Sequence, residues 1–113
     1  MRAPPVTAYV GLGANLGDPA AALHAAFEAL AHLEDTQLTA RSSLYRSAPV
    51  GYAQQPPFVN AVARISTHLE PGRLLALLLD TESQAGRVRT FANAPRTLDL
   101  DLLLYGDEVI RTP

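Results

Sequence analysis

Residues 98–105, with the sequence LDLDLLLY, most constrain the fold of this chain. Leucine alone favours helix, but here it alternates with other residues, a proline precedes the run and a glycine-containing turn follows it. This combination predicts a β-strand. One face of the strand would carry only leucine and would have to be covered by helices. The other face would begin with Asp99 and Asp101 and end with Leu103 and Tyr105.

The pair Asp99 and Asp101 is unusual in a strand that builds a core. Side chains two residues apart share a face, with α-carbons about 6.6 Å apart. Neighbouring carboxylates repel each other, and one tends to hold a proton. A divalent cation removes this conflict, because magnesium accepts carboxylate oxygens and keeps waters and substrate phosphates as further ligands. A solvated strand face with arginine partners is the alternative interpretation.

Periodicity and turn signals divide the rest of the chain into alternating strands and helices. Asp18 followed by Pro19 is a good helix start, and Glu70-Pro71-Gly72 begins the second helix. The predicted order is strand 7–12, helix 19–33, strand 38–46, strand 58–67, helix 71–86 and strand 98–105. This is the α+β, ferredoxin-like βαββαβ order, a four-stranded antiparallel sheet with both helices on one face. We expect one domain over residues 1–113.

Composition narrows the class of protein. The chain has 113 residues, 48% of them hydrophobic, and a net charge of −2, which gives no indication of nucleic-acid binding. No apolar run is long enough to span a membrane. The absence of cysteine excludes disulfides and zinc–thiolate sites and is compatible with the cytoplasm, where we expect the protein to work.

Three arginines precede the aspartates within ten residues, at Arg87, Arg89 and Arg96. Arginine forks suit phosphate oxygens. Metal-binding carboxylates beside such arginines are typical of phosphoryl transfer. The alternative is a set of surface salt bridges between these arginines and Asp99, Asp101 and Glu82.

Other residues carry weaker signals. Phe58 and Asn60 would lie on the same side of one strand, where they would stack on and hydrogen-bond to a flat heterocycle; ordinary packing of Phe58 is the alternative. The glycines at 11, 13 and 17 fit neither a P-loop nor a dinucleotide fingerprint, so a tight turn is the better interpretation. The three histidines, His24, His32 and His68, have no metal-ligand spacing, and we expect them on the surface.

Three segments together resemble one enzyme family. RTLDLDLLLYG with an upstream GRVR, SLYRSAPVG followed by QPPFVNAV, and AYVGLGANLGD are similar to 6-hydroxymethyl-7,8-dihydropterin pyrophosphokinases of folate biosynthesis. The resemblance runs in order over almost the whole chain. It implies a ferredoxin-like core, transfer of the terminal pyrophosphoryl group of ATP to the pterin hydroxymethyl oxygen with release of AMP, and two magnesium ions between the aspartates and the ATP phosphates.

The resemblance also implies roles for individual residues. The magnesium ions would be held by Asp99 and Asp101. The phosphate charge would be neutralised by Arg87 and Arg96, with help from Arg89. The pterin would be held by the backbone around Ser47 and Val50 and by the side chains of Phe58 and Asn60. The adenosine would contact Leu75 and Leu102. The loops 49–57 and 89–95 would close over ATP.

The chain departs from the family at three points. Phe58 stands where the family often has tyrosine, and FANAPRTLDLD replaces the usual RWGPRTLDLD, which leaves Asn93 or a gap at the tryptophan position. The family also continues past residue 113 with a histidine, an arginine and an aromatic. Either the sequence is a fragment or the protein has lost part of its site. We therefore expect the chain as given to fold but to catalyse poorly, and we expect the complete protein to be a monomer.

A function of another class also fits these residues. A non-catalytic domain of the same fold would bind a pterin or nucleotide, or would serve as an interaction module. A continuation of the reading frame with the missing histidine and arginine favours the enzyme, and an authentic stop favours the binding module.

Overall fold

The computed structural model describes residues 3–47, 57–85 and 98–109. In chain order the elements are β1 (Val6–Ala14), α1 (Pro19–Ala31), β2 (Thr36–Arg41), β3 (Tyr45–Ser47), β4 (Phe58–Thr67), α2 (Pro71–Gln84), β5 (Asp99–Tyr105) and β6 (Glu108–Val109).

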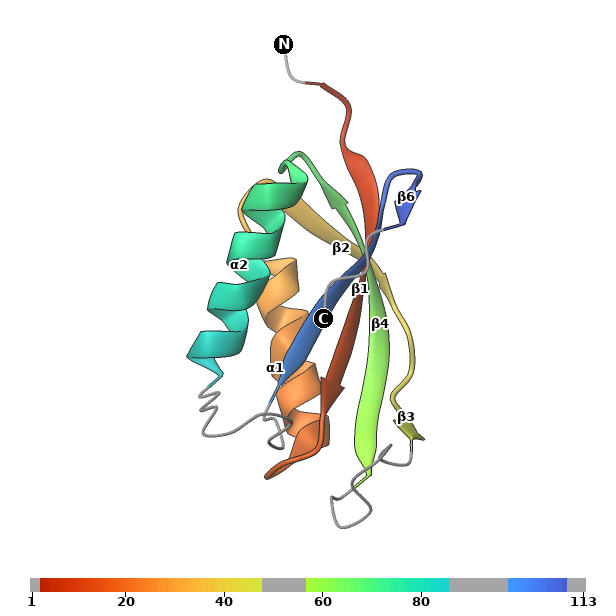
Figure 1. The fold of residues 1–113 in the computed structure, drawn as a ribbon, viewed down its shortest axis with the longest axis vertical. Coiled ribbons are helices and arrows are strands. Elements are labelled where there is room, and N and C mark those ends of the chain that lie inside the picture. Colours follow the sequence, from red (N-terminus) through yellow and green to blue (C-terminus); the bar gives the residue numbers. More distant parts are fainter. Residues whose placement is uncertain (1–2, 48–56, 86–97, 110–113) are drawn as a thin grey trace.

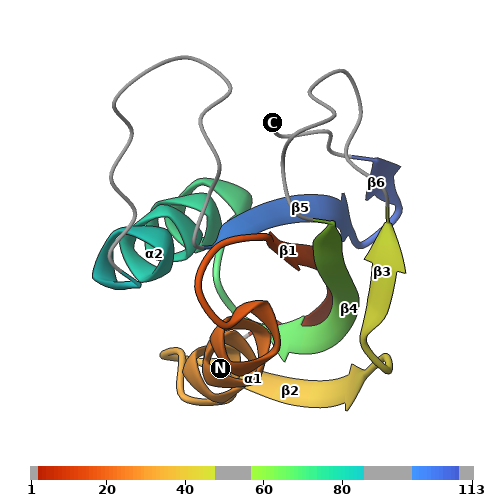
Figure 2. The same ribbon diagram turned by 90° about the horizontal axis from the view of Figure 1, so that it is seen from below.

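The strands form one antiparallel sheet in the order β2-β4-β1-β5-β6, and β3 also pairs with β4. Both helices lie on the same face of this sheet (Figures 1 and 2). The predicted ferredoxin-like arrangement is therefore confirmed for its four long strands and two helices. The short strand β6 was not predicted, and β2 and β3 replace a single predicted strand over residues 38–46.

Local sequence explains where the helices begin and which side they bury. The Asp18 carboxylate caps α1 by accepting a hydrogen bond from the Ala21 N–H at 3.1 Å, and Pro19 follows in the first turn. The buried face of α1 consists of Leu23, Ala26, Phe27 and Leu30. The buried face of α2 consists of Leu74, Leu78 and Glu82. Among the helices of the described part of the chain, none is both long and apolar enough to cross a membrane.

The core lies between the helices and the sheet. On β4 the predicted alternation holds, since Ala61, Ala63 and Ile65 are 0–1% exposed and all face the helices. The matching positions of β1 are Ala8, Val10, Leu12 and Ala14. Leu100 and Leu102 of β5 complete this face, together with Leu98, which directly precedes β5. The opposite face of the sheet has no helix over it in the described residues (Figure 2).

The pairing with β4 is interrupted between β2 and β3 for a physical reason. The pairing of β2 with β4 shifts register between Leu38 and Ala40. The Thr39 hydroxyl there donates to the Arg64 carbonyl at 3.0 Å. At Ser42 the hydroxyl accepts from the Val62 N–H at 2.8 Å. A side-chain oxygen thus replaces a backbone partner, and regular pairing resumes only at Tyr45.

A second register shift corrects the prediction for β5. Val10 of β1 pairs with Leu102, but the preceding Tyr9 pairs with Leu104, so Leu103 is an extra residue of a β-bulge. After the bulge the faces of β5 are exchanged. Tyr105 was predicted beside the aspartates, but it lies against the helix layer and donates its hydroxyl proton to the Leu69 carbonyl at 2.6 Å.

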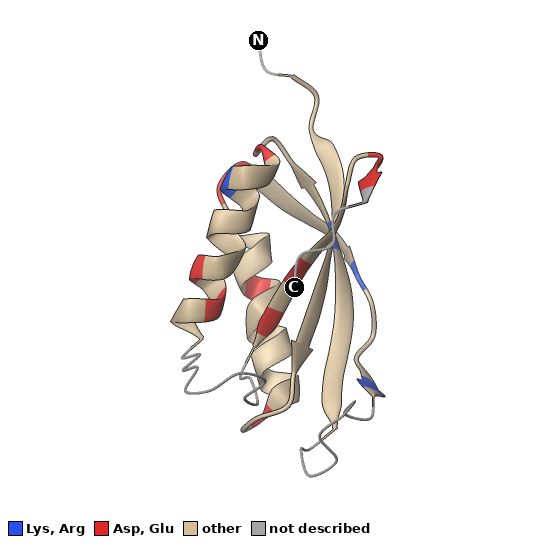
Figure 3. Ribbon diagram, in the orientation of Figure 1, with Lys and Arg blue, Asp and Glu red and all other residues tan. Residues whose placement is uncertain are grey.

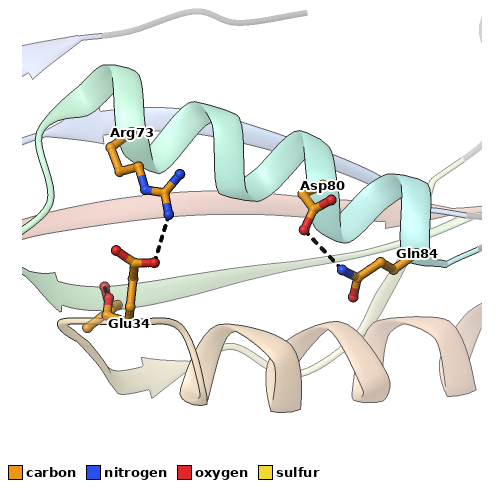
Figure 4. Close-up of polar contacts among 5 residues, drawn as sticks. Glu34, Arg73, Asp80 and Gln84 are labelled. Carbon is orange, nitrogen blue, oxygen red and sulfur yellow. Dashed lines mark hydrogen bonds and ion pairs between the residues drawn. The ribbon is translucent and has the colours of Figure 1, made fainter.

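Polar contacts between and along the helices lie at the surface (Figure 4). The Arg73 guanidinium at the start of α2 is 2.8 Å from the Glu34 carboxylate, which follows α1. These side chains are 55% and 51% exposed, so the pair contributes little to stability. On α2 the Gln84 amide donates to Asp80 at 3.0 Å. The packing of the core, rather than these contacts, therefore holds the helices on the sheet.

Candidate functional site

The two aspartates of β5 lie on the helix-free face of the sheet. In the pairing of β5 with β1, Asp99 lies opposite Gly13 and Asp101 lies opposite Gly11, with Leu100 between them facing the core. Figure 3 shows these acidic positions in red on the lower half of β5. Both side chains are half-buried. Because their cross-strand partners are glycines, β1 contributes no side chain beside the two carboxylates.

Gly11 and Gly13 form a flat floor in the middle of the sheet. A β-carbon at Gly13 would come within 3.3 Å of the Asn60 Oδ1 atom, and one at Gly11 within 3.4 Å of the Leu103 Cδ1 atom. The tight-turn interpretation is therefore wrong for these two residues, which belong to β1. It is right for Gly17, whose φ is +63°.

Aromatic and amide groups stand on the other side of this floor. Phe58 pairs with Ser47 and Asn60 pairs with Tyr45, which places all four on the helix-free face. The Asn60 Nδ2 group donates to the Ser47 hydroxyl at 2.8 Å, which holds the amide in place. Tyr45 is 52% exposed. The predicted neighbourhood of Phe58, Asn60 and Ser47 is thus present in the fold.

A groove of about 320 Å³ runs between the two groups. Its lining residues come from four strands and are Gly11, Leu12, Gly13, Tyr45, Phe58, Asn60, Ala61, Val62, Asp99, Asp101 and Leu103. One wall carries carboxylates and the other carries aromatic rings and an amide. Such a groove suits a flat polar heterocycle with a charged group directed toward β5.

The donor set suits magnesium better than a metal that needs a full protein cage. Within residues 3–47, 57–85 and 98–109, no group of three or more His, Cys, Asp or Glu side chains is arranged to hold a metal ion. Two carboxylates on one face supply only part of a coordination shell. Magnesium accepts such a shell because phosphates and waters complete it.

Several predicted residues lie either outside the described part of the chain or, where described, away from this groove. Arg87, Arg89, Arg96 and Val50, together with the loops 49–57 and 89–95 apart from Pro57, lie outside the described residues. Leu75 on α2 is partly buried against the core. Leu102 is 0% exposed and belongs to the core on the helix side of β5, so its side chain does not reach the groove.

Sequence reasoning missed the positions of four residues, three of them in the groove and one, Glu82, buried on α2. Tyr45 is two residues before Ser47, so the strand period could have placed it on the same face. The alternation of Gly11 and Gly13 with Val10 and Leu12 likewise indicated a strand with both glycines on one face. Glu82 was considered only as a surface salt-bridge partner. It is 3% exposed, and its spacing of four residues from Leu78 marks the buried face of α2.

The comparison with protein families decides the relationship. The model of the 7,8-dihydro-6-hydroxymethylpterin-pyrophosphokinase family matches residues 9–113. The chain belongs to this family.

Curated relatives have the same family name. The 2-amino-4-hydroxy-6-hydroxymethyldihydropteridine pyrophosphokinase of Haemophilus influenzae is 50% identical over 94% of this chain and 66% of its own length. The Pseudomonas aeruginosa protein of that name is 48% identical over 93% of this chain and 65% of its own length. The Pseudomonas putida protein of that name is 47% identical over 96% of this chain and 89% of its own length. The chain thus spans just under two thirds of the length of the first two relatives.

Proposed function

We propose that this protein transfers the terminal pyrophosphoryl group of ATP to 6-hydroxymethyl-7,8-dihydropterin in folate biosynthesis. The observation that supports this most is the groove in which Asp99 and Asp101 face Phe58 and Asn60 across a glycine floor. In this proposal the carboxylates form a cation-binding wall opposite a wall that suits a heterocycle. The identity of the two substrates is taken from the family to which the chain belongs.

In the proposed reaction the pterin hydroxymethyl oxygen attacks the β-phosphorus of ATP. The new oxygen–phosphorus bond forms as the bond between that phosphorus and the oxygen bridging to the α-phosphate breaks. AMP leaves with the bridging oxygen, and the hydroxyl proton passes to water. Phe58 would stack on the pterin, and Asn60, oriented by Ser47, would hydrogen-bond to it. Both would direct the hydroxymethyl group toward β5.

Asp99 and Asp101 would hold two magnesium ions, which would neutralise phosphate charge at the reacting phosphorus. We further propose that Arg87, Arg89 and Arg96 bind phosphate oxygens, that Val50 contributes backbone contacts to the pterin, and that Leu75 and the Leu102 backbone adjoin the adenosine. The proposed location of the protein is the cytoplasm, as expected from the sequence, and the proposed domain is the single unit 1–113.

The test measures AMP release from ATP in the presence of the pterin, with magnesium or with EDTA. AMP formation that requires both the pterin and magnesium supports the enzyme. Calorimetry with the pterin alone and with ATP runs in parallel. Binding without transfer would replace the enzyme by a pterin- or nucleotide-binding domain. The absence of both binding and transfer would overturn the proposal.

A further inference from the structure

Glu82 is a buried acidic residue on the core-facing side of α2. It is 3% exposed and shares this face with Leu74 and Leu78. Glutamate is almost never fully buried unless it has a partner, because an ionised carboxylate loses its hydration there. Its Oε2 atom accepts a hydrogen bond from the backbone N–H of Leu100 at 2.6 Å.

The partner of Glu82 lies between the two aspartates of the groove. Successive N–H groups of a strand point alternately to its two sides. The Leu100 N–H points away from β1, toward the side on which β6 pairs only with Leu104 and Tyr105. Within the described residues, Glu82 therefore supplies the acceptor that a neighbouring strand would provide. It fixes the backbone between Asp99 and Asp101 from the side opposite β1.

We propose, given the proposed function, that Glu82 is a positioning residue for the metal-binding wall. Its hydrogen bond sets the path of β5 at Leu100, and that path fixes the separation of the Asp99 and Asp101 carboxylates above the glycine floor. Glu82 itself does not line the groove. Its loss acts on the metal–nucleotide side of the site, and the pterin wall on β3 and β4 is held independently by the Asn60–Ser47 bond.

The experiment compares Glu82→Ala and Glu82→Gln with Glu28→Ala, which removes an exposed glutamate from α1. Nuclear magnetic resonance follows hydrogen exchange of the Leu100 amide and the amide shifts of Asp99 and Asp101. Calorimetry measures binding of α,β-methylene-ATP with magnesium and, separately, of the pterin. Circular dichroism checks that each variant is folded.

In Glu82→Ala we expect faster Leu100 exchange, shifted Asp99 and Asp101 amides and metal-dependent nucleotide binding weakened by about tenfold or more, since a hydrogen bond to a charged group is lost. Glu82→Gln keeps an acceptor oxygen but not the charge, so its effects are intermediate. The Kd for the pterin stays within about twofold. A general loss of packing would weaken both ligands alike. If Glu82→Ala fails to fold, the same comparison between wild type and Glu82→Gln decides.

Unchanged Leu100 exchange, or nucleotide binding equal to that of Glu28→Ala, would overturn the positioning role. Equal weakening of nucleotide and pterin binding would also overturn it. If the wild-type chain itself bound no metal–nucleotide, the proposed function would fail instead. The Leu100 exchange and the Asp99 and Asp101 shifts would still decide whether Glu82 holds β5.

Discussion

At the scale of single residues, Asp101 and Asp99 differ from the other carboxylates of the chain in facing a groove with a glycine floor. Asp101→Asn retains shape and removes the charge. We expect pyrophosphoryl transfer to fall by about a hundredfold or more, since metal-held charge stabilisation is worth several kcal/mol. The melting temperature should change little. Steady-state AMP release with magnesium measures the effect.

The matched control for Asp101→Asn is Asp80→Asn. Asp80 is exposed on α2, and its partner Gln84 still finds an acceptor oxygen in asparagine. Transfer should be unaffected by this change. Near wild-type turnover in Asp101→Asn would refute the assignment of β5 as the metal-binding wall.

Phe58 contributes the ring that we expect to stack on the pterin. Phe58→Ala should raise the Kd for the pterin about tenfold, because a stacked aromatic pair is worth about 0.5–1.5 kcal/mol beyond the apolar area that it buries. Phe58→Tyr keeps the ring and should bind normally. Fluorescence titration gives both values. ATP affinity should be the same in all three proteins, and a loss of ATP affinity in Phe58→Ala would contradict the division of the groove into two walls.

The floor formed by Gly11 and Gly13 leads to a separate prediction. In Gly13→Ala the new methyl group would lie 3.3 Å from the Asn60 Oδ1 atom and would push that amide away from Ser47. Pterin affinity should fall on the order of tenfold, which corresponds to about 1.4 kcal/mol. Gly72→Ala is the control, because nothing lies within 4 Å of its added methyl group. Calorimetry with the pterin distinguishes them, and equal affinities would show that the floor is not part of the site.

At the scale of elements, the β-bulge at Leu103 determines which side chains of β5 reach the groove. It places Tyr105 against the helix layer, where its hydroxyl donates to the Leu69 carbonyl at 2.6 Å. Tyr105→Phe leaves this carbonyl without its donor and should lower the free energy of unfolding by about 1 kcal/mol. Urea denaturation measures it. Tyr45→Phe alters an exposed tyrosine, and a similar loss there would mean that the Tyr105 bond adds nothing specific.

Periodicity within one segment predicted the long elements well and the irregular ones badly. The bounds of β4 agree with the prediction at 58–67 because its alternation is uninterrupted. The bulge in β5 was invisible, since it depends on how Leu102 and Leu104 pair with β1 rather than on the order of residues in β5. The break after β2 has the same origin. Its weak alternation was the trace of a register shift near Thr39.

At the scale of the whole molecule, the order of strands brings distant segments to one groove. β1 is central and carries the floor, while β5 on one side and β4 with β3 on the other carry the two walls. Spacing in the sequence predicted that Asp99 and Asp101 share one strand face and that Phe58 and Asn60 share another. The topology explains why these two pairs line the same groove. The hydrogen bond from the Leu100 N–H to the Glu82 carboxylate could not be predicted, because it depends on the contact between α2 and the edge of β5.

The proposed binding of a metal–nucleotide in the groove also predicts a response of the whole fold. A ligand that binds only the folded state stabilises it by about 2.7 kcal/mol at a hundred times its Kd. For a domain of this size that is a rise in melting temperature on the order of 10 °C. ATP with magnesium should produce this rise, and ATP with EDTA should not. The double variant Asp99→Asn, Asp101→Asn should lose the magnesium-dependent part while its own melting temperature stays near that of the wild type. A rise that survives EDTA or the double substitution would place the nucleotide elsewhere, because the two carboxylates of β5 are the only groups whose removal should uncouple magnesium from stability in this proposal.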